Sequence, residues 1–193
     1  AAVQAAFRFA LRQKDLPEDG IFLVALGKMG AFELNYSSDI DMAAFYDPDV
    51  FATGRDNPQK LADRVVRESM RILEEQTGEG YVFRTDLRLR PDPSSTPPAV
   101  STRMAATYYE SVGQNWERMV WIKARPVAGD TAAAEQFLTM MKPFVWRRHM
   151  DYWAISDVQA VKRMINAKAG KSALDDIAPD VKLGPGGIRE IEF

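Results

Sequence analysis

The chain has 193 residues, 46% of them apolar, a formal net charge of −2 and no cysteine. The length suits one sizeable domain or two small ones, and the apolar content excludes a disordered chain. The near-neutral charge argues against a general nucleic-acid binder, while the lack of cysteine excludes disulfides and zinc–thiolate sites and fits a cytoplasmic protein.

The first part of the chain predicts alternating helices and strands. Residues 1–13 favour a helix, and the apolar runs 21–26 and 40–46 favour strands. Asn57 is placed to cap a further helix that begins at Pro58. No apolar run approaches the roughly 20 residues that span a bilayer, so we expect no membrane segment.

Residues 81–90 alternate apolar and polar side chains, which predicts a third strand. A proline-rich loop, residues 91–98, follows it and is the best candidate for a domain boundary. The predicted strand would carry Tyr81, Phe83, Leu87 and Leu89 on its apolar face and Arg84, Asp86, Arg88 and Arg90 on its polar face.

Beyond this loop the pattern is mostly helical, from Thr102 to about Ala169. We therefore expect an α+β fold in which a small mixed sheet with helices, residues 1–98, is followed by a mostly α-helical domain, residues 99–193. The chain begins without Met and ends inside a patterned run, residues 191–193, so we expect it to be a fragment of a larger protein.

The segment 26–41 carries the most informative pattern. A glycine turn at Gly27 follows the first predicted strand, and Asp39 and Asp41 open the second. Side chains two residues apart on a strand share a face, so Asp39 and Asp41 would project together from Cα atoms roughly 7 Å apart, and their carboxylates could converge on a hard cation. Glycine before them would let the backbone approach a phosphate. The pattern predicts metal-assisted transfer of a phosphorus group; a plain hairpin with an acidic edge is the alternative.

This segment resembles the nucleotidyltransferase superfamily that includes DNA polymerase β, whose signature runs from an apolar residue and Gly to Asp-x-Asp. A more specific similarity, to the glutamine synthetase adenylyltransferase family, lies in residues 27–41. They read Gly-Lys-Met-Gly-Ala-Phe-Glu-Leu-Asn-Tyr-Ser-Ser-Asp-Ile-Asp. The resemblance implies a polymerase β-like catalytic core and nucleotidyltransferase activity. Further matches follow in the family's order at residues 86–91, 116–125, 147–152 and 183–193.

The resemblance also implies a site. Asp39, Asp41 and Asp86 would be the catalytic and metal-binding carboxylates, because a third carboxylate on a neighbouring strand completes the superfamily's metal site. Three carboxylates can hold two Mg²⁺ ions about 3.5–4 Å apart. Contacts to nucleotide or phosphate are expected from Gly27, Lys28, Ser38, Arg88, Arg90, Lys123 and Arg125.

The cationic members of this set have alternatives. The guanidinium groups of Arg88 and Arg90 could bind phosphate oxygens in a bidentate way. The alternative is that both arginines only form salt bridges on a solvated strand face. Lys123 and Arg125 could equally form a solvent-facing helix end, where cations are favoured. Lys28 stands where the superfamily usually has a small residue.

The ending Gly-Pro-Gly-Gly-Ile-Arg-Glu-Ile-Glu-Phe, residues 184–193, is similar to the N-terminal half of this family, which removes AMP from adenylylated glutamine synthetase. The resemblance implies phosphorolysis, in which phosphate attacks adenylyl-tyrosine and ADP forms, in the regulation of nitrogen assimilation. The implied partners are glutamine synthetase, phosphate, adenine nucleotide and a PII-type nitrogen-signal protein acting on the full-length enzyme, without nucleic acid or membrane. The alternatives are the forward half, which attaches AMP from ATP, and a catalytically silent docking module.

Overall fold

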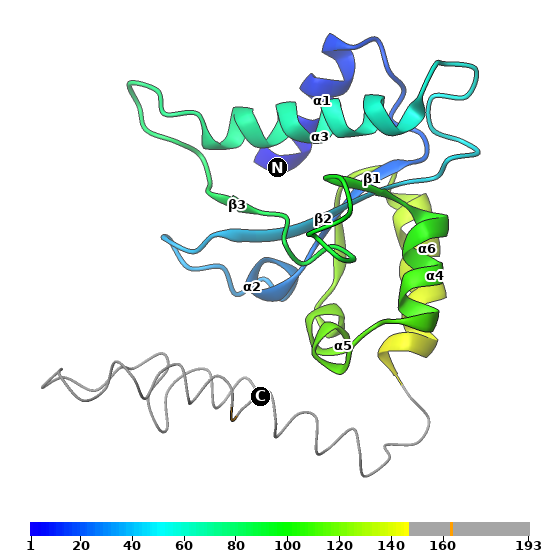
Figure 1. The fold of residues 1–193 in the computed structure, drawn as a ribbon. Helices are drawn as coiled ribbons and strands as arrows, with labels where there is room; N and C mark the ends of the chain where they lie inside the picture. Colours follow the sequence, from blue (N-terminus) through cyan, green and yellow to red (C-terminus); the bar gives the residue numbers. More distant parts are fainter. Residues whose placement is uncertain (147–162, 164–193) are drawn as a thin grey trace, which may run out of the picture. The chain divides into compact units, whose positions relative to one another are not determined.

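A five-stranded mixed sheet organises the residues that the computed structural model describes, 1–146 and Arg163 (Figure 1). Strand β1 lies between β2 and β5 and is antiparallel to both, while β3 and β4 each pair in parallel with β2. This arrangement confirms the expected α+β fold with a small mixed sheet. The strands are β1 (Ile21–Ala25), β2 (Ile40–Tyr46), β3 (Thr85–Asp86), β4 (Ala99–Ser101) and β5 (Arg125–Gly129).

Helices cover both faces of this sheet (Figure 1). The predicted start of the long helix α3 is confirmed, because the side chain of Asn57 accepts a hydrogen bond from the Lys60 N–H at 3.0 Å and Pro58 is the first helical residue. None of the described helices is long and apolar enough to cross a membrane. The helices are α1 (Ala2–Gln13), α2 (Gly27–Gly30), α3 (Pro58–Glu74), α4 (Thr102–Ser111), α5 (Asn115–Ile122) and α6 (Thr131–Val145).

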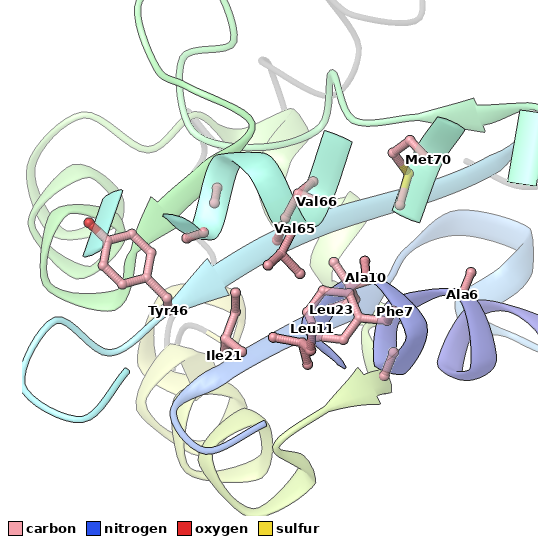
Figure 2. Packing of buried hydrophobic residues seen from close by; sticks show 14 of the residues in the cluster. Ala6, Phe7, Ala10, Leu11, Ile21, Leu23, Tyr46, Val65, Val66 and Met70 are labelled. Carbon is pink, nitrogen blue, oxygen red and sulfur yellow. The ribbon is translucent and has the colours of Figure 1, made fainter. Parts of the chain in front are cut away.

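Strand β2 divides the core into two clusters, as the two-residue repeat of a strand requires. Ile40 and Met42 point into the cluster that α1 and α3 close, and Figure 2 shows side chains of these helices packed over β1 and β2. Ala43 and Phe45 point into the opposite cluster, which α4, α5 and α6 close. Asp39 and Asp41 have the same parity as Phe45, so the carboxylates belong to the α5 side of the sheet at the start of β2.

Residues 125–129 form strand β5, although the sequence predicts a helical stretch there, and this part of the prediction is wrong. Pro126 has no N–H to donate, and it is tolerated because β5 lies at the edge of the sheet, where the register shifts between Leu23 and Val24. Gly129 has a φ of 83°, and a Cβ on it would lie 2.2 Å from the Ile21 carbonyl oxygen, so only glycine fits this pairing.

The third predicted strand is also shorter than residues 81–90, since only Thr85–Asp86 is extended in the sheet. The N–H groups of Val82 and Phe83 both donate to the Leu73 carbonyl at the end of α3 instead of to a neighbouring strand. The predicted apolar face is consequently divided. Phe83 and Leu87 pack on the α1–α3 cluster, Leu89 packs on the other, and Tyr81 is exposed.

Residues 99–146 contribute β4, β5 and three helices, and they belong to the same compact unit as the first 98 residues. The expected helices after Thr102 are therefore present as α4, α5 and α6, separated by a strand. The remainder of the predicted helical domain, including the glycine-rich segment 184–187, lies outside the described residues, apart from Arg163.

Candidate active site

Three carboxylates come together where β2 begins and β3 pairs with it. Asp41 is the direct register partner of Asp86 in the parallel β2–β3 pair, so the two Cα atoms lie about 4.8 Å apart and the side chains share a face. Asp39 stands one residue before β2, two residues from Asp41. The Ile40 N–H donates to the Arg84 carbonyl at 2.9 Å, which extends the pairing to the entrance of the strand. The structure thus places the three predicted carboxylates in one neighbourhood.

The pKa of Asp41 reflects the closeness of the three carboxylates. Burial is the largest cause that raises the pKa of Asp41, and the charges of Asp86 and Asp39 raise it further, against a smaller opposing effect of Arg88. The pKa of Asp86 moves the other way, because hydrogen bonds from Arg88 lower it more than burial raises it. A divalent cation would relieve the repulsion at Asp41, since opposite charge favours the ionised form.

Two arginines neutralise the outer carboxylates. The Arg84 guanidinium donates through Nε to Asp39 Oδ1 at 2.5 Å and through Nη2 to the Ser37 carbonyl. Arg88 donates through Nε and Nη2 to Asp86 Oδ2 at 3.0 and 2.6 Å, while its Nε and its backbone N–H reach Oδ1 at 3.1 and 2.8 Å. Asp86 is therefore engaged at both oxygens, and Asp39 at one.

The glycine turn predicted from the sequence lies against this cluster. Gly27 has a φ of 51°, and a Cβ on it would stand 2.8 Å from Asp41 Oδ2. The Leu26 N–H donates to the Asp41 carbonyl at 2.9 Å, which ties the start of α2 to β2. Lys28 is half-buried in the same turn, and Ser38 is half-buried beside Asp39. Glycine is favoured at position 27 because of this positive φ, and because a side chain there would displace the Asp41 carboxylate.

Lys123 and Arg125 hold the α2 segment from the other side. Arg125 donates to the carbonyls of Gly30 and Met29 at 3.0 and 2.9 Å, and its guanidinium stacks 3.9 Å from the centre of the exposed Phe32 ring. The Lys123 ammonium pairs with Glu33 at 2.9 Å and is 40% exposed. Lys123 stands at the C-cap of α5, as the helix-end alternative expects, and both cations also hold the α2 segment. A phosphate contact by either residue stays a prediction.

Arg90 has a different environment from Arg88. Its guanidinium donates to four backbone carbonyls, those of Leu87, Pro93, Thr96 and Pro97, at 2.8–3.0 Å. Burial is the largest cause that lowers its pKa. Arg90 thus holds the proline-rich loop together, and a phosphate contact by this residue stays a prediction.

The donor set suits a hard divalent cation such as Mg²⁺, which takes carboxylate oxygens. As the side chains stand, no three Asp, Glu, His or Cys residues within the described part of the chain are grouped so that they could hold a metal ion. Asp39 and Asp86 are each paired with an arginine. Asp41 lies between these two residues with no arginine bonded to its carboxylate in the described structure, so the chemistry of the set fits a metal once Asp86 is released.

The alternation of residues 81–90 predicts that Arg84 lies on the polar face of the third strand but indicates no role for it. Its bonds to Asp39 and the Ser37 carbonyl make it the residue that fixes the entrance to β2. No pattern in the sequence singles out Phe32, the aromatic partner of Arg125. This residue is 80% exposed, and its φ of 62° is unusual for a residue with a side chain.

Comparison with known proteins gives concordant matches. A family model described as glutamate-ammonia ligase adenylyltransferase matches residues 1–140. The chain is 52% identical over 189 residues to a bifunctional glutamine synthetase adenylyltransferase/adenylyl-removing enzyme of Rhizobium meliloti (strain 1021), covering 96% of this chain and 19% of the relative. Relatives with the same description in Caulobacter vibrioides and in Bradyrhizobium sp. (strain BTAi1) are 55% and 50% identical, over 92% and 100% of this chain and 18% and 21% of their own lengths. The chain therefore spans about a fifth of the length of the curated relatives it matches.

Proposed function

Because the chain belongs to the glutamate-ammonia ligase adenylyltransferase family, we propose that it carries the site that removes AMP from adenylylated glutamine synthetase. An oxygen of inorganic phosphate forms a bond to the adenylyl phosphorus, and the bond from that phosphorus to the tyrosine oxygen breaks. The products are ADP and unmodified tyrosine. The observation that supports nucleotidyl transfer is the in-register pair of Asp41 and Asp86 beside Gly27, with Asp39 next to them. The direction, removal rather than attachment, rests on the resemblance of residues 184–193 to the removing half.

Asp39, Asp41 and Asp86 would hold Mg²⁺, in a site for two ions. When bound, Mg²⁺ would stabilise negative charge on the phosphorus oxygens and on the departing tyrosine oxygen. These carboxylates are half-buried or exposed rather than in the core, so a ligand could reach them without unfolding of the sheet, in the case of Asp86 once Arg88 is released. Gly27 has no side chain to cover the backbone of the turn, which would leave it open to the phosphorus group. A Cβ there would also displace the Asp41 carboxylate.

The cations of the site would orient the attacking anion. The Arg88 side chain is 82% exposed beside the carboxylates, and its planar fork matches two phosphate oxygens. Lys28 and Ser38 flank the same cluster. Lys123 and Arg125 would act mainly by holding the α2 segment, through the Glu33 carboxylate and two backbone carbonyls.

The reaction does not require a histidine base. Phosphate already carries negative oxygen at neutral pH, and the leaving tyrosine oxygen has an ordinary pKa of about 10, so it departs more readily than an aliphatic alkoxide. Positioning and electrostatic stabilisation supply most of the catalysis in phosphoryl-type transfers. A site built from carboxylates and arginines matches that requirement.

The test incubates the 193-residue chain with adenylylated glutamine synthetase, Mg²⁺ and phosphate, and measures ADP by chromatography. We expect ADP release that depends on both phosphate and Mg²⁺ and that is lost in Asp41→Asn. Attachment of AMP from ATP without phosphate-dependent ADP release would assign the chain to the forward reaction. Failure to bind Mg²⁺ and nucleotide, together with binding of glutamine synthetase, would identify a docking module. A cytoplasmic location and control by a PII-type signal protein on the full-length enzyme are parts of the same proposal.

A further inference from the structure

We propose that Arg88 covers the Asp86 ligand position until a metal ion displaces it, and that the displaced guanidinium then binds the anionic co-substrate. This inference rests on the proposed metal site. It adds an order of events, because metal binding would have to precede the grip of Arg88 on phosphate. It also assigns Arg84, the other arginine of the cluster, a different and lasting role.

The contrast between the two ion pairs carries the inference. Arg88 occupies both carboxylate oxygens of Asp86, through Nε, Nη2 and its own backbone N–H. Arg84 reaches only Oδ1 of Asp39, through Nε. A metal ion can therefore use Oδ2 of Asp39 while Arg84 stays bonded. At Asp86 the guanidinium and the metal ion compete for the same lone pairs.

Arg84 is also held by more hydrogen bonds to the rest of the described structure than Arg88 is. Arg84 also donates to the Ser37 carbonyl, and its own carbonyl accepts from Ile40, so it is tied to the entrance of β2 at two further points. In the described structure the Arg88 guanidinium has Asp86 as its one hydrogen-bond partner, and its side chain is 82% exposed. Arg88 is consequently free to turn once Asp86 is taken, whereas Arg84 is held.

The charges of the site indicate what the displaced Arg88 guanidinium would bind. A cation at the three carboxylates removes the charge that retains Arg88, since Asp39 and Asp41 also attract this guanidinium in addition to Asp86. The nearest strong acceptors for its fork would then be the oxygens of a phosphate brought to the metal. Arg88 would thus serve as the counter-ion of Asp86 before metal binding and as an anion ligand afterwards.

The test is calorimetric titration of the chain with Mg²⁺ in the absence of phosphate. Arg88→Gln should bind Mg²⁺ about tenfold more tightly than the unchanged chain, because no charge-assisted pair has to be broken. Arg84→Gln removes the same charge at the same site but frees only Oδ1 of Asp39, whose Oδ2 is already open to a metal ion, so it should change affinity by less than about threefold. Arg88→Lys should fall between the two, because lysine keeps the charge without the fork.

The matched control is Arg103→Gln, which breaks an exposed arginine–aspartate pair of 2.7 Å with Asp49, beyond the far end of β2. It should leave Mg²⁺ affinity unchanged. A direct readout is the Nε–H signal of each arginine in ¹H–¹⁵N spectra, assigned with the lysine variants. Mg²⁺ should move the Arg88 signal toward that of a solvated guanidinium and leave the Arg84 signal bonded.

The outcomes separate two failures. Equal tightening in Arg84→Gln and Arg88→Gln would show a general charge effect and overturn the displacement. Mg²⁺ binding with an unmoved Arg88 signal would overturn it as well. If no variant binds Mg²⁺ and Asp41→Asn makes no difference, the metal site of the proposed function is itself wrong.

Discussion

Replacement of Gly27 by alanine tests whether the glycine turn exists to make room for the Asp41 carboxylate. The substitution has two physical effects. The residue has a φ of 51°, where an L-residue costs about 1–2 kcal/mol. The new Cβ would also stand 2.8 Å from Asp41 Oδ2, so the carboxylate must rotate away from its position beside Asp86. The first effect acts on stability and the second on the site.

Gly54→Ala is a matched control for the backbone effect alone. Gly54 has a φ of 78°, and a Cβ on it would meet nothing within 4 Å. Both variants should lose about 1–2 kcal/mol of unfolding free energy, or roughly 2–8 °C in melting temperature for a chain of this size. Gly27→Ala alone should lose turnover, by about tenfold to a hundredfold, because a displacement of about 1 Å at a reacting centre has that effect.

The assay combines urea unfolding of both variants with Mg²⁺ titration and phosphate-dependent ADP release. Equal stability losses with a selective loss of Mg²⁺ affinity and turnover in Gly27→Ala would support the reasoning. If Gly27→Ala keeps the Mg²⁺ affinity and turnover of Gly54→Ala, then the close approach of residue 27 to Asp41 has no role in the site.

Three further predictions concern the site and its supports. The double variant Asp39→Asn/Asp41→Asn should reduce ADP release to background with an unchanged far-UV circular dichroism spectrum, and wild-type turnover would contradict the ligand assignment. Arg90→Ala should cost about 1–3 kcal/mol in urea unfolding because four carbonyls lose their donor. Arg88→Ala should leave the unfolding free energy nearly unchanged because its side chain is exposed, and equal losses in the two variants would refute this division. Backbone N–H groups at the start of α6 lower the pKa of Asp130, so its stabilisation is full above the unfolded pKa of about 3.9 and is lost as pH falls through the folded pKa. Urea unfolding at pH 6 and pH 3 should therefore show a smaller pH difference in Asp130→Asn, and an identical difference would contradict the assignment.

The parts of the fold that the sequence predicts well are those with local signals. Strand β2 follows from an unbroken apolar run, and the start of α3 follows from Asn57 and Pro58, which satisfy the first turn in a known way. The shared face of Asp39 and Asp41 needs only the two-residue repeat. The fold class follows from the order of such elements.

The errors arise where distant contacts decide the structure. A proline within residues 125–129 argues against a strand, and only the edge position of β5 next to β1 makes it acceptable. The alternation of residues 81–90 predicts a long strand, but the Leu73 carbonyl at the end of α3 takes two of its N–H groups. Neither partner can be identified from the segment alone.

The candidate site shows the same division. Sequence identifies Asp86 through family resemblance, but the parallel register that sets it opposite Asp41 is a property of the folded sheet. The even spacing of Arg88 and Arg90 suggests equal roles. The structure gives Arg88 a carboxylate and Arg90 four carbonyls, because the chain turns after Asp86.

The most direct test of the proposed phosphorolysis follows the phosphorus atom of the co-substrate. The chain is incubated with adenylylated glutamine synthetase, Mg²⁺ and ³²P-labelled inorganic phosphate, and the nucleotide product is separated and degraded position by position. We expect the label in the β-phosphate of ADP, with none in the α-phosphate, and no product from Asp39→Asn/Asp41→Asn. Release of unlabelled AMP, or transfer of AMP from ATP to glutamine synthetase without labelled ADP, would contradict the proposal.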